Sequence, residues 1–372
     1  MSSSPRSTPR SSSPAEDALL AGALAEHGRR FRRRANVVAI GVGVAYSERS
    51  GRFMPGQTHG TRATLALKAI VKRKPKRLAA RDRLPRTVRV PISDDGRTRV
   101  VRVPVDVVLQ EEVLGGPELS DVGAVDRADY PHTGFPAPGH RLFAGHGDGS
   151  DDSPPGLDRG FDWDIGTVGA VVSDGQRRYV VTAGHVLIDP YVAGSVFPSQ
   201  CRVGFALTDA GLHENNPDSP VPATPGDGGL VVDVVALPLT PRQSELSEQE
   251  PWGVASDSEL QHFHGQGAVI RVERDHAIVD LPGTVEAYFD EFSGRINGKD
   301  VRFGPTLLLR CGGGLPVSGD SGAPVIARHP TNGSTTLIGF HIGRTTGSAT
   351  AAPVCYVMAA APVLAHAGLG LI

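Results

Sequence analysis

The sequence predicts a mostly β protein that carries a small α/β module near its N-terminus. From Gly166 onward, short apolar runs alternate with turn residues, and such a density of short strands is typical of an all-β barrel or sandwich. The 372 residues suffice for about two domains of roughly 150 residues each, and 39% hydrophobic residues suffice for a packed core. No stretch approaches the roughly 20 apolar residues of a membrane-spanning helix, which excludes a helical membrane protein.

Charge is divided unevenly along the chain. Residues 1–113 carry 23 Lys and Arg against 10 Asp and Glu, whereas the remaining residues carry 15 against 30. The formal net charge of −2 is therefore the sum of two opposite surpluses. This asymmetry predicts two modules with different surfaces.

The N-terminal residues and the cysteines indicate the compartment. Residues 1–16 are rich in Ser, Pro and Arg and lack the apolar core of a secretory signal, so we expect a disordered tail on a cytoplasmic protein. Cys201, Cys311 and Cys355 are then expected to stay reduced, with a single disulfide as the alternative. No Cys-x-x-Cys spacing occurs, and neither a metal nor a cofactor is expected. The excess of Arg over Lys is typical of a GC-rich bacterial genome.

Residues 17–113 have the spacing of a small module of one helix and several strands. Asp17–Arg34 has the Ala- and Leu-rich pattern of a helix that ends in arginines. Apolar, β-branched or alternating runs predict strands over residues 37–47, 63–71, 87–91 and 100–109. The range 114–160 is rich in Gly, Pro, Asp and Ser, and we expect it to form a linker or a wrapping loop.

The basic cluster of residues 72–77, KRKPKR, admits more than one partner. Such a cluster is a candidate surface for nucleic acid, but aromatic residues that could stack on bases are scarce around it. We interpret it as a solvated basic face, with nucleic-acid binding as the less favoured alternative. Because the remaining chain carries the opposite charge, a further hypothesis is that the basic N-terminal module docks on the acidic remainder of the same chain.

Two short strings in the β region carry the chemistry of a nucleophilic serine. The string TAGH ends at His185, and the string GDSG contains Ser321. A serine hydroxyl is a weak nucleophile until an imidazole takes its proton, and the imidazole needs a carboxylate that holds its tautomer. A tight glycine-flanked turn can also direct backbone N–H groups at a developing oxyanion.

These strings, in this order and within a region of short strands, resemble the chymotrypsin-like serine proteases. The resemblance covers about residues 161–365 and implies a double β-barrel protease domain over 161–372. It further implies Ser321 as the nucleophile, His185 as the general base, and the amides of Gly319 and Ser321 as the oxyanion hole. The function implied is that of a serine endopeptidase that acts on proteins or peptides through an acyl-enzyme.

The third member of the triad is expected between the two motifs, just before an apolar strand. Asp227 in GDGGLVVDVV matches the family's Asp-x-Ala-Leu type of segment, with Gly at the Ala position. Asp233, which follows in VVDVVAL, is the rival. The spacing from His185 and to Ser321 favours Asp227, and Asp233 remains open.

The pocket for the substrate side chain is expected beside Ser321. In the trypsin branch of the family an Asp lies six residues before the nucleophile, but that position is Leu315 here, which implies a small or apolar preference. The segment LIGFHIGR, with His341 and Gly343, is similar to a wall strand of glutamyl endopeptidases, and a charged imidazole there would favour an acidic side chain. The Thr or Ser that assists in those enzymes is replaced here by Pro316.

Two further expectations follow from looser resemblances. The stretches from NVVAIGVGV to VPVDVV, before TAGHVL, look like bacterial trypsin-like proteins related to the plant narrow-leaf protease family. Arg141 begins a string that faintly resembles a zymogen cleavage site, where a new N-terminal amine would pair with Asp320; processing there is an alternative to direct activity. The rival to the enzyme is a non-catalytic barrel whose basic module contacts a partner, and the oligomeric state stays open.

Overall fold

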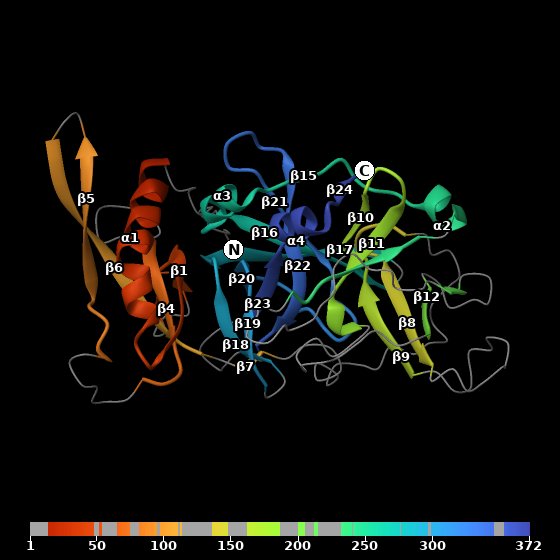
Figure 1. The fold of residues 1–372 in the computed structure, drawn as a ribbon, viewed down its shortest axis with the longest axis horizontal. Helices are drawn as coiled ribbons and strands as arrows, with labels where there is room; N and C mark the ends of the chain where they lie inside the picture. Colours follow the sequence, from red (N-terminus) through yellow and green to blue (C-terminus); the bar gives the residue numbers. More distant parts are fainter. Residues whose placement is uncertain are drawn as a thin grey trace, which may run out of the picture.

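The computed structural model confirms the mostly β fold class and builds it around one closed six-stranded barrel. The structure describes the following residues: 14–47, 52–53, 65–74, 82–94, 97–110, 112–113, 136–147, 162–186, 200–204, 212–214, 232–239, 241–275, 277–296, 299–345 and 353–372. Figure 1 shows three regions side by side: the N-terminal helix and strands, the barrel, and a group of smaller sheets.

The closed barrel lies in the middle of the molecule. Its strands are β16 (Gly267–Arg274), β17 (Ala277–Phe289), β20 (Thr306–Cys311), β21 (Pro324–Arg328), β22 (Thr335–Arg344) and β23 (Val354–Ala359). They are hydrogen-bonded in the order β16-β21-β22-β23-β20-β17, and β17 pairs with β16 to close the ring. Most of their buried side chains are apolar, so burial of this surface from water is the main force that holds the barrel together.

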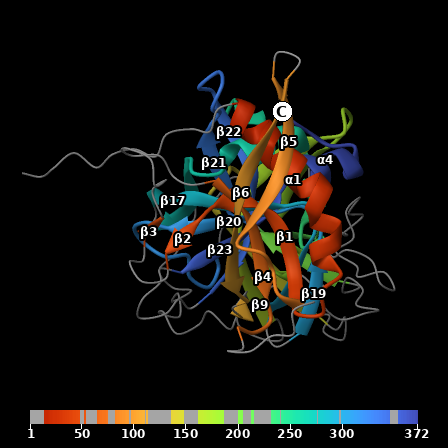
Figure 2. The same ribbon diagram turned by 90° about the vertical axis from the view of Figure 1, so that its left-hand side faces the viewer.

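The expected N-terminal helix and strands are confirmed. The helix α1 (Pro14–Arg32) packs on a sheet of β1 (Val37–Val44), β4 (Leu65–Val71), β5 (Thr87–Asp94) and β6 (Arg97–Leu109). Figure 2 shows the helix lying across this sheet. Leu20, Ala23 and Phe31 of the helix are buried against it, and arginines occupy the last helical turn, where the helix dipole favours positive charge.

The N-terminal sheet continues directly into the barrel. Strand β1 pairs antiparallel with the end of β17, with Val42 opposite Tyr288 and Gly43 opposite Ala287. A Cβ atom at Gly41 or Gly43 would overlap the backbone carbonyl oxygens of β17, so the two strands approach only because these residues are glycines. The eleven-stranded sheet that results shares one apolar core between both regions.

A buried ionic cluster lies at this junction. Lys68 of β4 is 1% exposed, and its Nζ donates to Asp106 Oδ2 at 2.7 Å and to Glu286 Oε1 at 2.7 Å. Glu286 lies at a β-bulge of β17 and also accepts from Nε of Arg310, at 2.8 Å. Burial by itself raises the pKa of Glu286, but Lys68 and Arg310 outweigh it and leave this pKa below its ordinary value.

Two four-stranded sheets lie on the other side of the barrel. One has the order β14-β11-β10-β24 and the other β13-β12-β8-β9. Their bounds are β8 (Arg141–Gly147), β9 (Asp162–Thr167), β10 (Ala170–Ser173), β11 (Arg178–Thr182), β12 (Gln200–Gly204), β13 (Leu212–Glu214), β14 (Val235–Pro238) and β24 (Gly370–Leu371). Strand β8 lies inside the range expected to be a linker; its sequence RLFAGHG has little β propensity, and pairing with β9 and β12 supplies its hydrogen bonds.

Short elements complete the fold. They are β2 (Tyr46–Ser47), β3 (Arg52–Phe53), β7 (Glu112–Val113), η4 (Gly184–Val186), α2 (Pro241–Leu246), β15 (Gly253–Val254), α3 (Asp257–Leu260), η5 (Gln261–Phe263), β18 (Phe292–Ile296), β19 (Lys299–Phe303) and α4 (Ala360–Ala367). None of the described helices is long and apolar enough to cross a membrane. Cys311 and Cys355 are free thiols whose Sγ atoms lie 2.8 Å apart on neighbouring strands.

Candidate active site

His185 and Asp233 are brought together by the pairing of two strands. Strand β11 ends at Thr182 and β14 begins at Val235, and these two residues are opposite each other in an antiparallel ladder. Residues just after β11 therefore lie beside residues just before β14. The helical turn η4 turns His185 toward Asp233, and the His185 backbone N–H donates to Asp233 Oδ1 at 2.9 Å.

Ser321 stands on a tight turn that is anchored on both sides. The N–H of Gly322 donates to the carbonyl of His341 on β22, and the carbonyl of Ser321 accepts from the N–H of Thr167 on β9. Gly319 has a φ of 87°, and a Cβ there would lie 2.8 Å from Nη1 of Arg141, so both the backbone conformation and the space require glycine. The turn is thus fixed against two different sheets.

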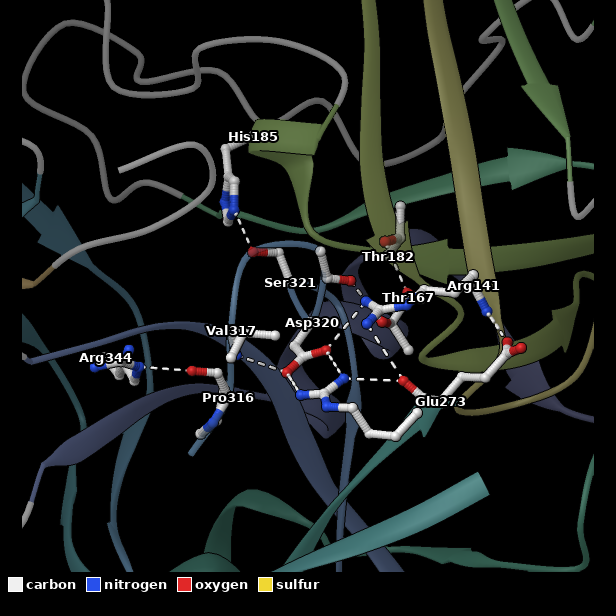
Figure 3. Close-up of polar contacts among 12 residues, drawn as sticks. Arg141, Thr167, Thr182, His185, Glu273, Pro316, Val317, Asp320, Ser321 and Arg344 are labelled. Atoms are coloured by element: carbon white, nitrogen blue, oxygen red, sulfur yellow. Dashed lines mark hydrogen bonds and ion pairs between the residues drawn. The ribbon is translucent and has the colours of Figure 1, made fainter. Parts of the chain in front are cut away.

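A continuous line of polar contacts joins the three side chains. Asp233 Oδ2 lies 2.8 Å from His185 Nδ1, and His185 Nε2 lies 2.7 Å from Ser321 Oγ. Figure 3 shows the imidazole of His185 facing the hydroxyl of Ser321. Asp233 is 0% exposed and Ser321 is 1% exposed, so little water competes for these contacts.

The structure brings His185 and Ser321 together as the sequence predicts, but the carboxylate beside His185 is that of Asp233. Asp227 lies outside the described residues. Sequence reasoning favours Asp227 because of its spacing from His185 and to Ser321 and its match to the family's segment, whereas the strand of the structure begins only at Val235. With that start, Asp233 meets the same rule, because it lies just before an apolar strand.

The amides of Gly319 and Ser321 are available to an incoming group. Within the described part of the chain, neither N–H donates a hydrogen bond. The carbonyl of Gly319 is held by the hydroxyl of Thr167 at 2.8 Å, which fixes the orientation of the peptide units of this turn. Unoccupied donors on a rigid turn suit an oxyanion hole.

Asp320 anchors the turn from inside the molecule. Its carboxylate is 0% exposed and accepts from Arg274 through both oxygens, with Nη1 2.6 Å from Oδ1. Arg141 of β8 lies at ion-pair distance, with 3.0 Å between Nη1 and Oδ1, and the N–H of Val317 donates to Oδ2. Sequence reasoning missed Arg274, since nothing near it in sequence connects β16 with the GDSG string.

The predicted pocket residues differ in their surroundings. Leu315 is 40% exposed, whereas His341 and Gly343 are buried in β22. Among the described residues, neither ring nitrogen of His341 has a hydrogen-bond partner. Burial, with smaller contributions from the charges of His185, Arg344 and Arg274, lowers its pKa to about 4, although Asp320 acts in the opposite direction. His341 is thus neutral near pH 7 and does not supply the positive charge on which its suggested role depends.

Metal-binding groups are not gathered in the described part of the chain. No cluster of three or more His, Cys, Asp or Glu side chains there has the arrangement of a metal site.

Comparison with known proteins gives similarity to proteases at low identity. No model of a protein family matches the sequence, and no curated protein matches it. Among solved structures, Thermobifida fusca Protease A has 16% identity, covers 64% of this chain and 98% of its own, and gives a TM-score of 0.37. A glutamic acid specific serine protease has 16% identity, covers 63% and 100%, and gives 0.39. An alpha-lytic protease homolog, N4, has 16% identity, covers 63% and 98%, and gives 0.37.

Proposed function

We propose that the protein is a serine endopeptidase whose catalytic triad consists of Ser321, His185 and Asp233. The observation that carries the proposal is the line of contacts from Asp233 through the imidazole to the serine hydroxyl. Asp233 takes the role that the sequence suggested for Asp227. Proteins or peptides are the substrates, since such a triad activates the hydroxyl for attack on an acyl carbon.

Each residue has a defined step in the reaction. Nδ1–H of His185 donates to Asp233, which leaves the lone pair of Nε2 to accept the proton of Ser321 as Oγ attacks the substrate carbonyl. The amides of Gly319 and Ser321 then stabilise the negative charge on the carbonyl oxygen. The protonated imidazole gives its proton to the leaving amine, and water attacks the acyl-enzyme by the same route in reverse.

The intact chain is competent for this reaction. In the zymogen hypothesis, cleavage after Arg141 creates an amine that pairs with Asp320, yet Asp320 already has Arg274 and Arg141 as partners. Arg141 is 2% exposed and begins strand β8, and both Arg141 and Leu142 are paired with β9, which protects the peptide bond between them. Mass spectrometry of active enzyme should therefore find the bond after Arg141 uncut; activity confined to a cleaved form would contradict this.

A fluorophosphonate probe tests the proposal, because it modifies an activated serine without requiring a particular substrate. We expect wild-type protein to be labelled and Ser321→Ala to lose the label. Ser318→Ala, in the same turn, is the matched control and should keep it. Absence of labelling in folded wild-type protein would favour the alternative, a barrel that acts as a binding scaffold.

The choice between the two carboxylates has its own test. We expect Asp233→Asn to lower kcat by about 10⁴-fold, since the imidazole then adopts the wrong tautomer. Asp227→Asn should leave kcat within about twofold of wild type. The opposite pattern would restore the assignment that the sequence favoured.

A further inference from the structure

Arg344 is a buried cation next to the predicted pocket that the catalytic scheme does not use. It is the last residue of β22, follows a β-bulge between His341 and Gly343, and is 8% exposed. A bulge beside an active site redirects the side chains that follow it. Here the guanidinium is directed at the segment that leads into Ser321.

Within the described part of the chain, the hydrogen bonds of Arg344 are with carbonyl groups only. Nε donates to the carbonyl of Pro316 at 2.6 Å, and Nη1 donates to the carbonyl of Thr345 at 3.2 Å. Among the described residues, no carboxylate lies within 4 Å of the guanidinium, in contrast to Arg274 and Arg310. A buried positive charge without a counter-ion is costly, which makes a purely structural role a poor explanation.

The position of Arg344 joins the two segments that flank the nucleophile. Pro316 lies five residues before Ser321, and β22 is hydrogen-bonded to the turn on its other side through Gly322 and His341. Figure 3 shows Arg344 reaching toward Pro316, on the opposite side of the Ser321–Asp320 turn from Arg141 and Glu273. The family resemblance places the pocket for the substrate side chain at these same segments, through Leu315, His341 and Gly343.

The segment that precedes Pro316 is exposed to solvent. Residues 312–315 are exposed, and Leu315 next to Pro316 places no charge there. A guanidinium has five N–H donors in a planar fork, and the two carbonyl contacts use two of them. The remaining donors match the two oxygens of a carboxylate, which a guanidinium binds more strongly than it binds a neutral acceptor.

We propose that Arg344 is a specificity-determining residue that binds the carboxylate of a Glu or Asp at the substrate position preceding the cleaved bond. The proposal rests on the proposed peptidase function and names the substrate class for the same site. It assigns the positive charge to the guanidinium and leaves the neutral His341 as a wall residue. Substrate binding would supply the counter-ion that the described residues do not provide.

The test uses fluorogenic peptides that differ only in Glu, Gln or Leu before the cleaved bond, because Glu and Gln have the same shape. We expect wild-type kcat/KM for Glu to exceed that for Gln by about 30-fold or more, as for a charge pair removed from water. Arg344→Gln should reduce the ratio to within about threefold. Arg344→Lys should give an intermediate ratio, because the charge stays and the planar fork is lost. Arg328→Gln, which removes an exposed arginine, should leave the ratio unchanged.

Fluorophosphonate labelling of each variant separates the possible failures. If Ser321 is labelled but wild type has no preference for Glu over Gln, or if Arg344→Gln retains it, the role of Arg344 is overturned and the peptidase stands. If wild type is neither labelled nor active, both proposals are overturned. If Arg344→Gln is not labelled because its site is disturbed, the Arg344→Lys variant decides. A ratio of kcat/KM for Glu over Gln that is as high in Arg344→Lys as in wild type would then contradict the proposal. If cleavage instead requires a free C-terminal carboxylate on the peptide, and not a Glu side chain, that result also overturns the role of Arg344.

Discussion

The catalytic turn and the N-terminal junction each hold a buried carboxylate between two cations, but the two clusters act on different properties. At the turn, Asp320 is held by Arg274 and Arg141, and it immediately precedes the nucleophile. At the junction, Glu286 is held by Lys68 and Arg310.

The difference between the clusters lies in what surrounds each carboxylate. Asp320 belongs to a short turn whose backbone, in the proposed peptidase, points two amides and one hydroxyl at the substrate. Glu286 belongs to a long strand that is paired on both sides. We therefore expect the ion pairs of Asp320 to affect the reaction rate and the ion pairs of Glu286 to affect the stability of the sheet.

Among the variants of the two clusters, Asp320→Asn should have the largest effect on the rate. It leaves Arg274 and Arg141 without their carboxylate, and we expect the turn to shift enough to lower kcat/KM by about 100-fold or more. Steady-state kinetics on folded protein, verified by circular dichroism, measures this. If the rate stays within about threefold of wild type, the turn does not depend on its anchor, and the comparison between the clusters fails.

Glu286→Gln should mainly affect stability. Removal of one partner from a buried ionic cluster costs about 3–5 kcal/mol, because the remaining charges stay buried. Denaturant unfolding measures this loss, while kcat/KM of the folded fraction should stay within about twofold of wild type. Lys68→Met and the double variant complete a cycle, and a coupling free energy near zero would show that the two side chains do not act together.

His341 gives a third, unpaired case, and its effect depends on pH. Its folded-state pKa of about 4 lies below the ordinary 6.5, so the unfolded chain binds the proton more readily. This difference does not affect the free energy of unfolding well above pH 6.5, where His341 is neutral in both states. It lowers the free energy of unfolding by roughly 3 kcal/mol as the pH decreases to 4. His341→Gln should flatten the free energy of unfolding over this interval, whereas His366→Gln, at an exposed position, should not. Equal slopes for wild type and His341→Gln would contradict the expected shift.

Gly41→Ala should have the smallest of these effects and tests the junction without altering a charge. The added methyl group would overlap the carbonyl of Tyr288, and such overpacking costs about 1–3 kcal/mol. Thermal unfolding measures the change, and Gly267→Ala, in strand β16 where an added methyl group meets no atom within 4 Å, provides the control for glycine replacement inside a strand. A larger loss in the control would mean that the contact between β1 and β17 adds little.

The sequence was sufficient for the parts of the site that local motifs encode. TAGH and GDSG locate His185 and Ser321 because a helical turn and a tight turn are local structures. Asp233 was ranked second, because the beginning of β14 depends on its pairing with β11 and not on the apolar run itself. Arg274, Arg141 and Arg344 were missed as neighbours of the turn because each reaches it through a tertiary contact.

The same distinction applies to the fold. The helix and strands of residues 17–113 follow from their periodicity, but their continuation into the barrel does not. The signal that could have indicated it is the pair Gly41 and Gly43, since glycine inside a strand often marks the close approach of another backbone. The partner strand, however, lies too far along the chain to be identified from the pattern.

The pairing of β1 with β17 has a consequence for biosynthesis. Lys68 and Glu286 are separated by 218 residues, so the ribosome completes the first strands long before it makes their partner. Until then β1 presents an unpaired edge, and Lys68 lacks one of its carboxylates. A nascent chain in that condition is a natural client for a chaperone, and the nucleophile itself is translated only after the missing strand has emerged.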